Sequence, residues 1–408
     1  MRKLSARVAL LLPLLSLPVA SCASEVTTSS EPNDFDHDVV ISMSLTVAPG
    51  EELHQCQLVM LPTDSEIQVV AFSHKYTAGS HHFLVFATDL DTIPPHLAGR
   101  YDCVNGDEPI MEHAQGILYG AQSAEATFPL PSGVGFKMKA HQVVMLQAHY
   151  LNPTASAIAA KIQAGFDTAP AASIRQQAGF MIFYDPFIYI PAQSTATAGI
   201  RCSVPSDVNV IAAFTHYHQR GTAMRVWVDP SMSQESAEPF HETHDWEHPA
   251  DFKGPLAVPA GSALRFECAY TNGDSVDVFQ GPNAATSEMC VFAGLYYPQA
   301  PRDFDNCADL SITGHGDKTC SSVLSCVQNC PGDDAPRFTN GGVLVGPCWE
   351  RCVASGCQGA VDKVLPVSFC VGDKCAAECA MGADACEACA TTQCAAEVGV
   401  CLAHQCGR

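Results

Sequence analysis

Cysteine constrains the fold of this chain more than any other residue type. The sequence has 21 cysteines in 408 residues, and fourteen of them lie between residues 320 and 406. That density is typical of a small disulfide-held domain. Three cysteine pairs there are spaced four apart, which places both members of a pair on one helical face: Cys326 and Cys330, Cys348 and Cys352, Cys375 and Cys379. We expect residues 306–408 to form short helices joined by disulfides, with zinc binding as the less favoured alternative.

The N-terminus has the layout of an export signal. Basic residues precede an apolar run from Val8 to Val19 that is too short to span a bilayer. The run closes on a segment ending at Cys22 that resembles the lipobox of bacterial lipoproteins, although an ordinary signal peptide with a chance cysteine is the alternative. We therefore expect residues 1–21 to be removed, Cys22 to be acylated and residues 22–36 to be a flexible tether. The chain would be a bacterial envelope lipoprotein, on the periplasmic face or at the cell surface.

Charge and hydropathy limit the partners of the remaining chain. The net charge of −22 provides no basic surface for nucleic acid, so no nucleic-acid partner is expected. No second apolar stretch is long enough to cross a membrane, and we expect a soluble, monomeric body. With Cys22 assigned to the lipid, an even number of cysteines remains, which favours ten disulfides in an oxidising compartment.

Short β runs separated by turn residues fill residues 37–305, and hardly any stretch keeps a helical period for three turns. Examples are the apolar runs 83–86, 143–146 and 180–183. The length suits two domains better than one. We expect a mainly β fold of two consecutive antiparallel jelly-roll-like sandwiches, residues 37–172 and 173–305, with the boundary in the turn-rich segment 167–170.

Histidines recur at spacings suited to metal binding. Alternation along a strand places His216 and His218 on one face and Tyr217 on the other, although such a pair is often only a surface feature. His149 ends another apolar run. The adjacent His81 and His82 would point to opposite faces of a regular strand, so they share a metal only if the backbone is irregular or if they use different ring nitrogens.

The order of these motifs resembles the copper type II, ascorbate-dependent monooxygenases, a family that includes the peptidylglycine and dopamine β monooxygenases. The matching segments are His81-His82-Phe83-Leu84, Leu146-Gln147-Ala148-His149-Tyr150, Thr215-His216-Tyr217-His218 and Glu288-Met289-Cys290. The resemblance covers about residues 37–305. It implies two sandwiches, each holding one copper ion, with a solvent cleft between the two ions.

The resemblance also implies separate roles for the two copper ions. The ion bound by His81, His82 and His149 would store an electron from ascorbate or another donor. The ion bound by His216, His218 and Met289 would bind O2 and attack a substrate C–H bond, and a thioether ligand favours Cu(I) there. The alternative for Met289 is a core side chain.

Six cysteines outside the tail fit the disulfides of this family. The resemblance implies three pairs: Cys56 with Cys103, Cys202 with Cys307, and Cys268 with Cys290. The fourteen cysteines of the tail then remain, again an even number. Their connectivity does not follow from the sequence.

The chain departs from the peptide-amidating members beside the second copper. Phe214 stands where those members have an arginine that grips the substrate carboxylate, and Val291 and Ala293 stand where they have asparagine and tyrosine. We expect a more apolar substrate pocket and no activity on peptides with a C-terminal glycine. The substrate, a small molecule or a peptide-like compound, stays open.

Three functions are compatible with these features. The leading one is a copper-dependent hydroxylase, and the second is a non-catalytic envelope lipoprotein that stores or senses copper. The third is an adhesin whose cysteine-rich tail binds a partner protein. Further histidines at 241, 244 and 248 lie between prolines in an expected loop, and a metal role for them is the less favoured alternative.

Overall fold

The computed structural model describes residues 35–104, 110–307, 316–330, 337–339, 342–344 and 346–407. The expected signal, Cys22 and nearly all of the tether lie outside the described residues. In the described part, no helix is long and apolar enough to span a membrane.

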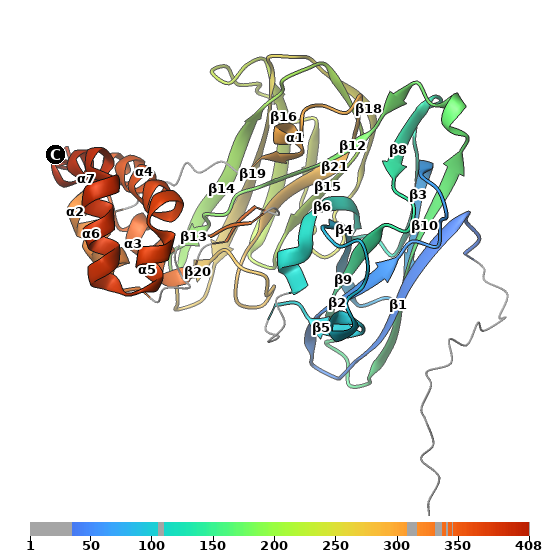
Figure 1. The fold of residues 1–408 in the computed structure, drawn as a ribbon, viewed down its shortest axis with the longest axis horizontal. Helices are drawn as coiled ribbons and strands as arrows, with labels where there is room; N and C mark the ends of the chain where they lie inside the picture. Colours follow the sequence, from blue (N-terminus) through green and yellow to red (C-terminus); the bar gives the residue numbers. More distant parts are fainter. Residues whose placement is uncertain are drawn as a thin grey trace, which may run out of the picture. The chain divides into compact units, whose positions relative to one another are not determined.

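The first sandwich packs a six-stranded sheet against a five-stranded sheet (Figure 1). The larger sheet has the order β1-β10-β3-β8-β11, with β7 on β3: β1 (Val39–Val47), β10 (Ile158–Ala169), β3 (Ile67–Tyr76), β8 (Val134–Met138), β11 (Gln176–Gln177) and β7 (Glu125–Pro129). The smaller sheet has the order β5-β2-β9-β4-β6: β5 (Arg100–Asp102), β2 (Glu52–Met60), β9 (Val143–Leu151), β4 (Ser80–Thr88) and β6 (Ala114–Ala121). Short 3-10 turns lie at Pro95–Leu97, Ile110–His113 and Ala171–Ser173. Because β11 pairs with β8, this sheet continues past residue 172 to residue 177.

Strand β1 shows why these segments become strands. Val39, Ile41, Met43, Leu45 and Val47 are all buried in the core of the first sandwich, while most of the residues between them face outward. An apolar residue at every second position suits a strand with one buried face. The same alternation is visible in β2 and β19.

The second sandwich packs a five-stranded sheet against a four-stranded sheet. The first has the order β18-β15-β21-β12-β22: β18 (Phe252–Val258), β15 (Val208–Tyr217), β21 (Cys290–Tyr297), β12 (Gly179–Tyr184) and β22 (Asn306–Cys307). The second has the order β14-β19-β16-β17: β14 (Ser194–Ser203), β19 (Ala263–Asn272), β16 (Gly221–Asp229) and β17 (His241–Thr243). A small pair, β13 (Tyr189–Ile190) with β20 (Val278–Phe279), and helix α1 (Arg302–Asp305) complete this part.

Strand β15 is buried on both faces and joins the two sandwiches. Ala212 and Phe214 pack into the core of the first sandwich, whereas Ala213 and Tyr217 pack into the core of the second. A strand with two covered faces has no polar side to alternate with, which explains the continuous apolar run before His216. The two sandwiches are therefore in apolar contact along this strand.

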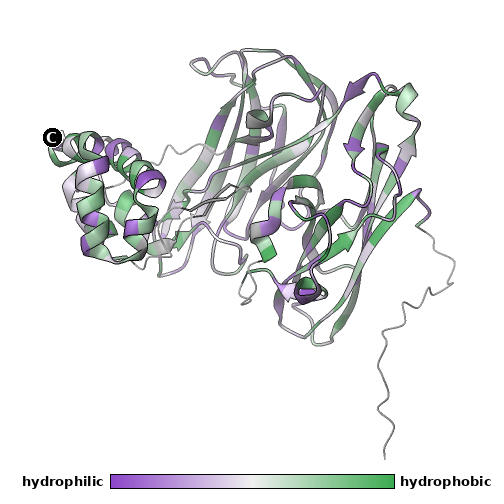
Figure 2. Ribbon diagram, in the orientation of Figure 1, coloured by the Kyte–Doolittle hydropathy of each residue, from purple (hydrophilic) through white to green (hydrophobic). Residues whose placement is uncertain are grey.

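The tail is helical and rich in disulfides, as predicted. Its elements are α2 (Cys320–Val327), α3 (Pro347–Ala354), α4 (Gln358–Lys374), α5 (Ala376–Ala380), α6 (Ala383–Gln393), α7 (Ala395–Leu402) and the hairpin β23 (Arg337–Thr339) with β24 (Gly342–Leu344). Figure 2 shows hydrophobic and hydrophilic segments side by side on these helices, as in amphipathic helices packed on a small core. Trp349 of α3 is fully buried and packs on Phe187 of the second sandwich.

Ten disulfides join twenty cysteines in the described part of the chain. Three are the pairs that the resemblance implies: Cys56–Cys103, Cys202–Cys307 and Cys268–Cys290. Seven lie in the tail: Cys320–Cys401, Cys326–Cys352, Cys330–Cys348, Cys357–Cys406, Cys370–Cys394, Cys375–Cys389 and Cys379–Cys386. Thiols bonded in this way are not zinc ligands. Their number indicates an oxidising compartment.

Candidate metal centre

Three histidines of the first sandwich come together on two neighbouring strands. His82 of β4 lies opposite His149 of β9, and the register of this pair shifts between Ser80 and His82. This irregularity lets the adjacent His81 and His82 turn toward the same place, which a regular strand would prevent. Ligand nitrogens of His81, His82 and His149 all lie within 4.8 Å of one another. An irregular backbone is one of the two conditions under which the sequence allows a shared metal, and the use of different ring nitrogens is the other.

Two histidines of the second sandwich lie at the end of β15. His216 occupies the face that carries Phe214 and points toward the first sandwich, while Tyr217 points the other way into the core. The ring centroids of His216 and His218 are 5.2 Å apart. Both side chains therefore lie close enough to contribute to one site.

The two histidine groups meet in one cluster, which differs from the cleft that the resemblance implies. The ring of His81 lies 4.7 Å from that of His216 and 5.6 Å from that of His218. Ligand nitrogens of His81, His216 and His218 also lie within 4.8 Å of one another, so His81 belongs to both groups. The reason is the apolar contact along β15, because Phe214 is packed against the first sandwich only two residues before His216.

One ring nitrogen of each of three histidines is held by an acceptor. Nε2 of His149 lies 2.9 Å from a carboxylate oxygen of Glu52, and Nδ1 of His218 lies 3.0 Å from the carbonyl of Ser287. Nδ1 of His216 lies 3.0 Å from Oε1 of Gln122. These oxygens accept hydrogen bonds, so each of the three nitrogens carries the hydrogen.

The opposite nitrogens of these rings are buried and have no hydrogen-bond partner among the described residues. They are Nδ1 of His149 and Nε2 of His216 and His218. Nε2 of His81 and Nδ1 of His82 are likewise buried and without a hydrogen-bond partner in the described part of the chain. A buried polar atom without a partner costs about 1–3 kcal/mol. A ring fixed through one nitrogen, with a lone pair on the other, is the arrangement of a metal ligand. The donor set therefore fits a metal that accepts imidazole, such as copper.

Burial keeps these rings neutral. Loss of solvent lowers the pKa of His82 to about 3 and that of His218 to about 4, and it lowers the pKa of His81, His149 and His216 well below the ordinary value. The neighbouring imidazoles add to this effect, because each would repel a second positive charge. Neutral imidazole is the form that binds metal.

A family model matches the second sandwich. Residues 177–313 match the family model of the copper type II ascorbate-dependent monooxygenase, C-terminal domain. This copper monooxygenase domain contains His216, His218 and the segment around Met289. No curated protein matches the chain. Among solved structures, the PBSX exported protein XepA is 7% identical with a TM-score of 0.18, and the match covers 63% of this chain and 86% of the XepA chain. PNGF-II is 7% identical with a TM-score of 0.24, and the match covers 64% of this chain and 65% of the PNGF-II chain. Scores this low support no argument.

The segment before Met289 lies against the histidines of the copper monooxygenase domain. The buried carboxylate of Glu288 accepts hydrogen bonds from the backbone nitrogens of His218 and Arg220, at 2.9 and 2.8 Å. The carbonyl of Met289 accepts one from the hydroxyl of Tyr270 at 2.6 Å, directly before the Cys290 disulfide. These contacts fix the backbone of the segment beside His218. The thioether of Met289 stays a predicted ligand.

The three residues of the expected substrate pocket share the face of His216. Val291 lies opposite His216 and Ala293 lies opposite Phe214 in the β15–β21 pair. Phe214 is buried between Phe128 of the first sandwich, at 5.4 Å, and Phe180, at 6.5 Å. Phe214 and Ala293 thus belong to the apolar contact between the sandwiches.

Two residues beside the cluster escaped the sequence analysis. His54 of β2 is directly opposite His149, and their rings stack at 3.7 Å. Burial lowers the pKa of His54 to about 4. Gln122 contacts ligands of both groups. Glu52 and His54 are two residues apart and so share one face of the strand, which is a weak sequence signal of a metal site. An isolated glutamine such as Gln122 gives no such signal.

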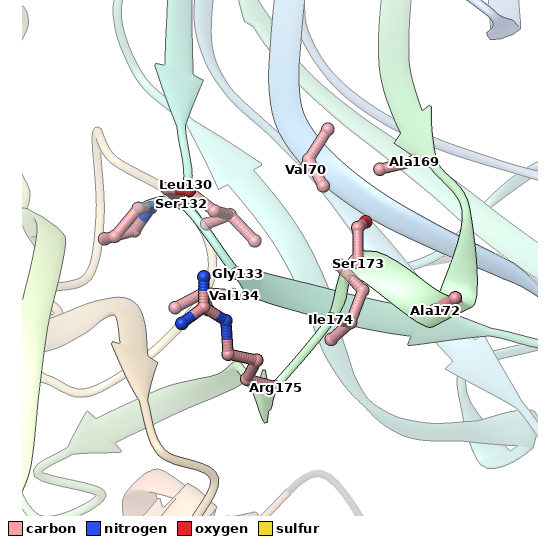
Figure 3. Close-up of a pocket in the computed structure, with 11 residues that line it drawn as sticks. Val70, Leu130, Ser132, Gly133, Val134, Ala169, Ala172, Ser173, Ile174 and Arg175 are labelled. Carbon is pink, nitrogen blue, oxygen red and sulfur yellow. The ribbon is translucent and has the colours of Figure 1, made fainter.

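Other candidates lie elsewhere. His244 and His248 are exposed. Trp246 of the same loop approaches the cluster, with its ring 5.3 Å from that of His81. A hollow of about 450 Å³ on the first sandwich is lined mainly by small and apolar side chains, such as Val70 and Leu130, with Arg175 at its edge (Figure 3). The hollow includes none of the clustered histidines.

Proposed function

We propose that this protein is a copper-dependent monooxygenase that hydroxylates a C–H bond of an organic substrate with O2 and a reductant such as ascorbate. The observation that carries the proposal is the cluster of five neutral histidines, each with a buried ring nitrogen that has no partner among the described residues, three of them oriented by an acceptor at the opposite nitrogen. The match of residues 177–313 to the copper monooxygenase domain supports the choice of metal.

Six side chains would hold two copper ions. We assign His81, His82 and His149 to the first, and His216, His218 and Met289 to the second. Copper bound in this way would supply one-electron chemistry with O2. The protein's own part is to hold the rings: Glu52 orients His149, Ser287 orients His218, and burial excludes protons that would compete with the metal.

The substrate of this centre is proposed to be uncharged or apolar. Phe214 supplies no positive charge for a carboxylate, and Val291 and Ala293 add apolar surface on the same face. We expect a glycine-extended peptide to give no amide product with the copper-loaded protein and ascorbate. Amide formation at a rate usual for peptide-amidating enzymes would contradict this expectation.

One experiment separates an enzyme from a copper store. The copper-loaded protein should contain two copper ions per chain and consume O2 when ascorbate is added. Met289→Ala should abolish the oxygen consumption while the His81, His82 and His149 site stays metallated, as counted by elemental analysis. Met232→Ala, at a half-exposed methionine, is the matched control. Copper binding without any ascorbate-driven oxygen consumption would favour storage or sensing.

We further propose that the protein is anchored at the bacterial envelope through Cys22. The ten disulfides of the described residues support an oxidising compartment. Cys22→Ser should move the protein from the membrane fraction to the soluble fraction. An unchanged distribution would exclude the anchor. The disulfide-rich tail is the proposed contact for a protein partner, and its loss should abolish such binding but not copper binding.

A further inference from the structure

Gln122 reaches across the contact between the sandwiches. It directly follows β6 of the first sandwich and is buried, yet its side chain bonds to two parts of the second. Nε2 donates to the carbonyl of Trp246 at 2.7 Å, and Oε1 lies 3.0 Å from Nδ1 of His216. The same Nε2 lies 3.4 Å from Nδ1 of His81. One amide therefore contacts a ligand from each histidine group.

The Trp246 carbonyl decides which way the amide faces. A carbonyl oxygen only accepts, so the NH2 group of Gln122 must point toward Trp246. Its oxygen then faces His216 and also only accepts, which requires the hydrogen of the neutral ring to be on Nδ1. Nε2 of His216 is left with a lone pair, and it is the buried nitrogen that lacks a partner.

We propose that Gln122 is a positioning residue that keeps His216 in the tautomer able to bind the second copper through Nε2. It also ties the Trp246 loop, residues 244–251, to the histidine cluster. The inference rests on the proposed function in one respect, that copper is the ligand of His216. Loss of such an orienting partner typically weakens metal binding 10- to 100-fold.

Two substitutions separate positioning from packing. Gln122→Met keeps the length of the side chain but removes the acceptor for His216. Gln122→Glu keeps an acceptor of the same shape but buries a carboxylate and cannot donate to Trp246. Positioning predicts that the glutamate variant binds copper better than the methionine variant. A packing role predicts the reverse, because a buried charge disturbs an interface more than a methionine does.

The first measurement is Cu(I) affinity by competition with a chromophoric Cu(I) chelator. We expect the second site of Gln122→Met to bind about 10- to 100-fold more weakly than the wild type, and that of Gln122→Glu to lie close to the wild type. Gln234→Met, at an exposed glutamine, is the matched control. Equal affinities in all variants, or a weaker glutamate variant, would overturn the inference.

The second measurement needs no metal. Nitrogen-15 NMR of histidine-labelled, copper-free protein distinguishes the two tautomers, with the His216 signal assigned by its loss in His216→Gln. We expect Nδ1–H in the wild type and a shift toward Nε2–H in Gln122→Met. An unchanged tautomer would refute the positioning role. Wild-type protein that binds no copper would refute the proposed function instead, while the tautomer result still decides the role of Gln122.

Discussion

His74 shows how a structural histidine differs from a candidate metal ligand in this molecule. It is fully buried in the first sandwich, and both ring nitrogens have partners: Nδ1 with the hydroxyl of Tyr119 and Nε2 with the carbonyl of Ser123, each at 2.7 Å. Among the clustered histidines, His149 and His218 are as fully buried as His74, yet each keeps one ring nitrogen unpartnered within the part of the chain that the structure describes. Hydrogen bonding at the ring nitrogens therefore distinguishes His74 from these two histidines, whereas burial does not.

His74 gives a pH prediction that is independent of metal. Burial lowers its pKa to about 4 in the folded protein, against 6.5 for the unfolded chain. Below pH 6.5 the unfolded chain takes up a proton that the folded state refuses, so stability falls as the pH decreases toward 4. In His74→Gln, the loss of unfolding free energy between pH 7 and pH 4.5, measured by urea denaturation, should shrink by about 2–3 kcal/mol. Exposed His96→Gln should leave the loss unchanged; equal losses in all three proteins would contradict the prediction.

At the scale of elements, β15 carries the site and the contact between the sandwiches on the same face. His216 and Phe214 are neighbours on that face, and Phe214 packs between Phe128 and Phe180. Any change that loosens this packing should also move His216. The strand therefore couples stability to the geometry of the metal centre.

Truncation of Phe214 tests this coupling. Phe214→Ala should lower the free energy of unfolding by about 3–5 kcal/mol, because it leaves a cavity in a closed apolar contact. Met232→Ala, in an exposed loop, should change it by less than about 0.5 kcal/mol. Urea denaturation of the metal-free proteins measures both. A loss below about 1 kcal/mol for Phe214→Ala would show that the contact is loose.

The sequence predicts features that depend on local pattern. Alternation in β1 and the shared face of His216 and His218 follow from the period of a strand. The meeting of His81 with His216 does not, because it depends on how two sheets pack, and no residue spacing encodes that. Gln122 is hidden for the same reason, since its partner lies 94 residues away. The family resemblance named the candidate ligands but implied a cleft in place of this contact.

For the whole molecule, copper should stabilise both sandwiches together. The clustered histidines come from β4 and β9 of one sandwich and from the end of β15 in the other. At a free copper concentration of about 100 times the dissociation constant, each site should add about 2.7 kcal/mol to the free energy of unfolding. Chemical denaturation with copper and with a chelator measures the difference, which His149→Gln should roughly halve. A copper-independent midpoint would contradict the linkage.

The burial of β15 on both faces also limits what evolution and protein engineering can do with this chain. The copper monooxygenase domain match begins at residue 177, which suggests a cassette that could be moved between proteins. A fragment cut there would expose Phe214, Ala293 and Leu295, which the first sandwich now covers. An exposed apolar strip of this kind promotes aggregation. Moving the second sandwich into another protein would therefore require the first sandwich, or a substitute for the surface that covers β15, to move with it.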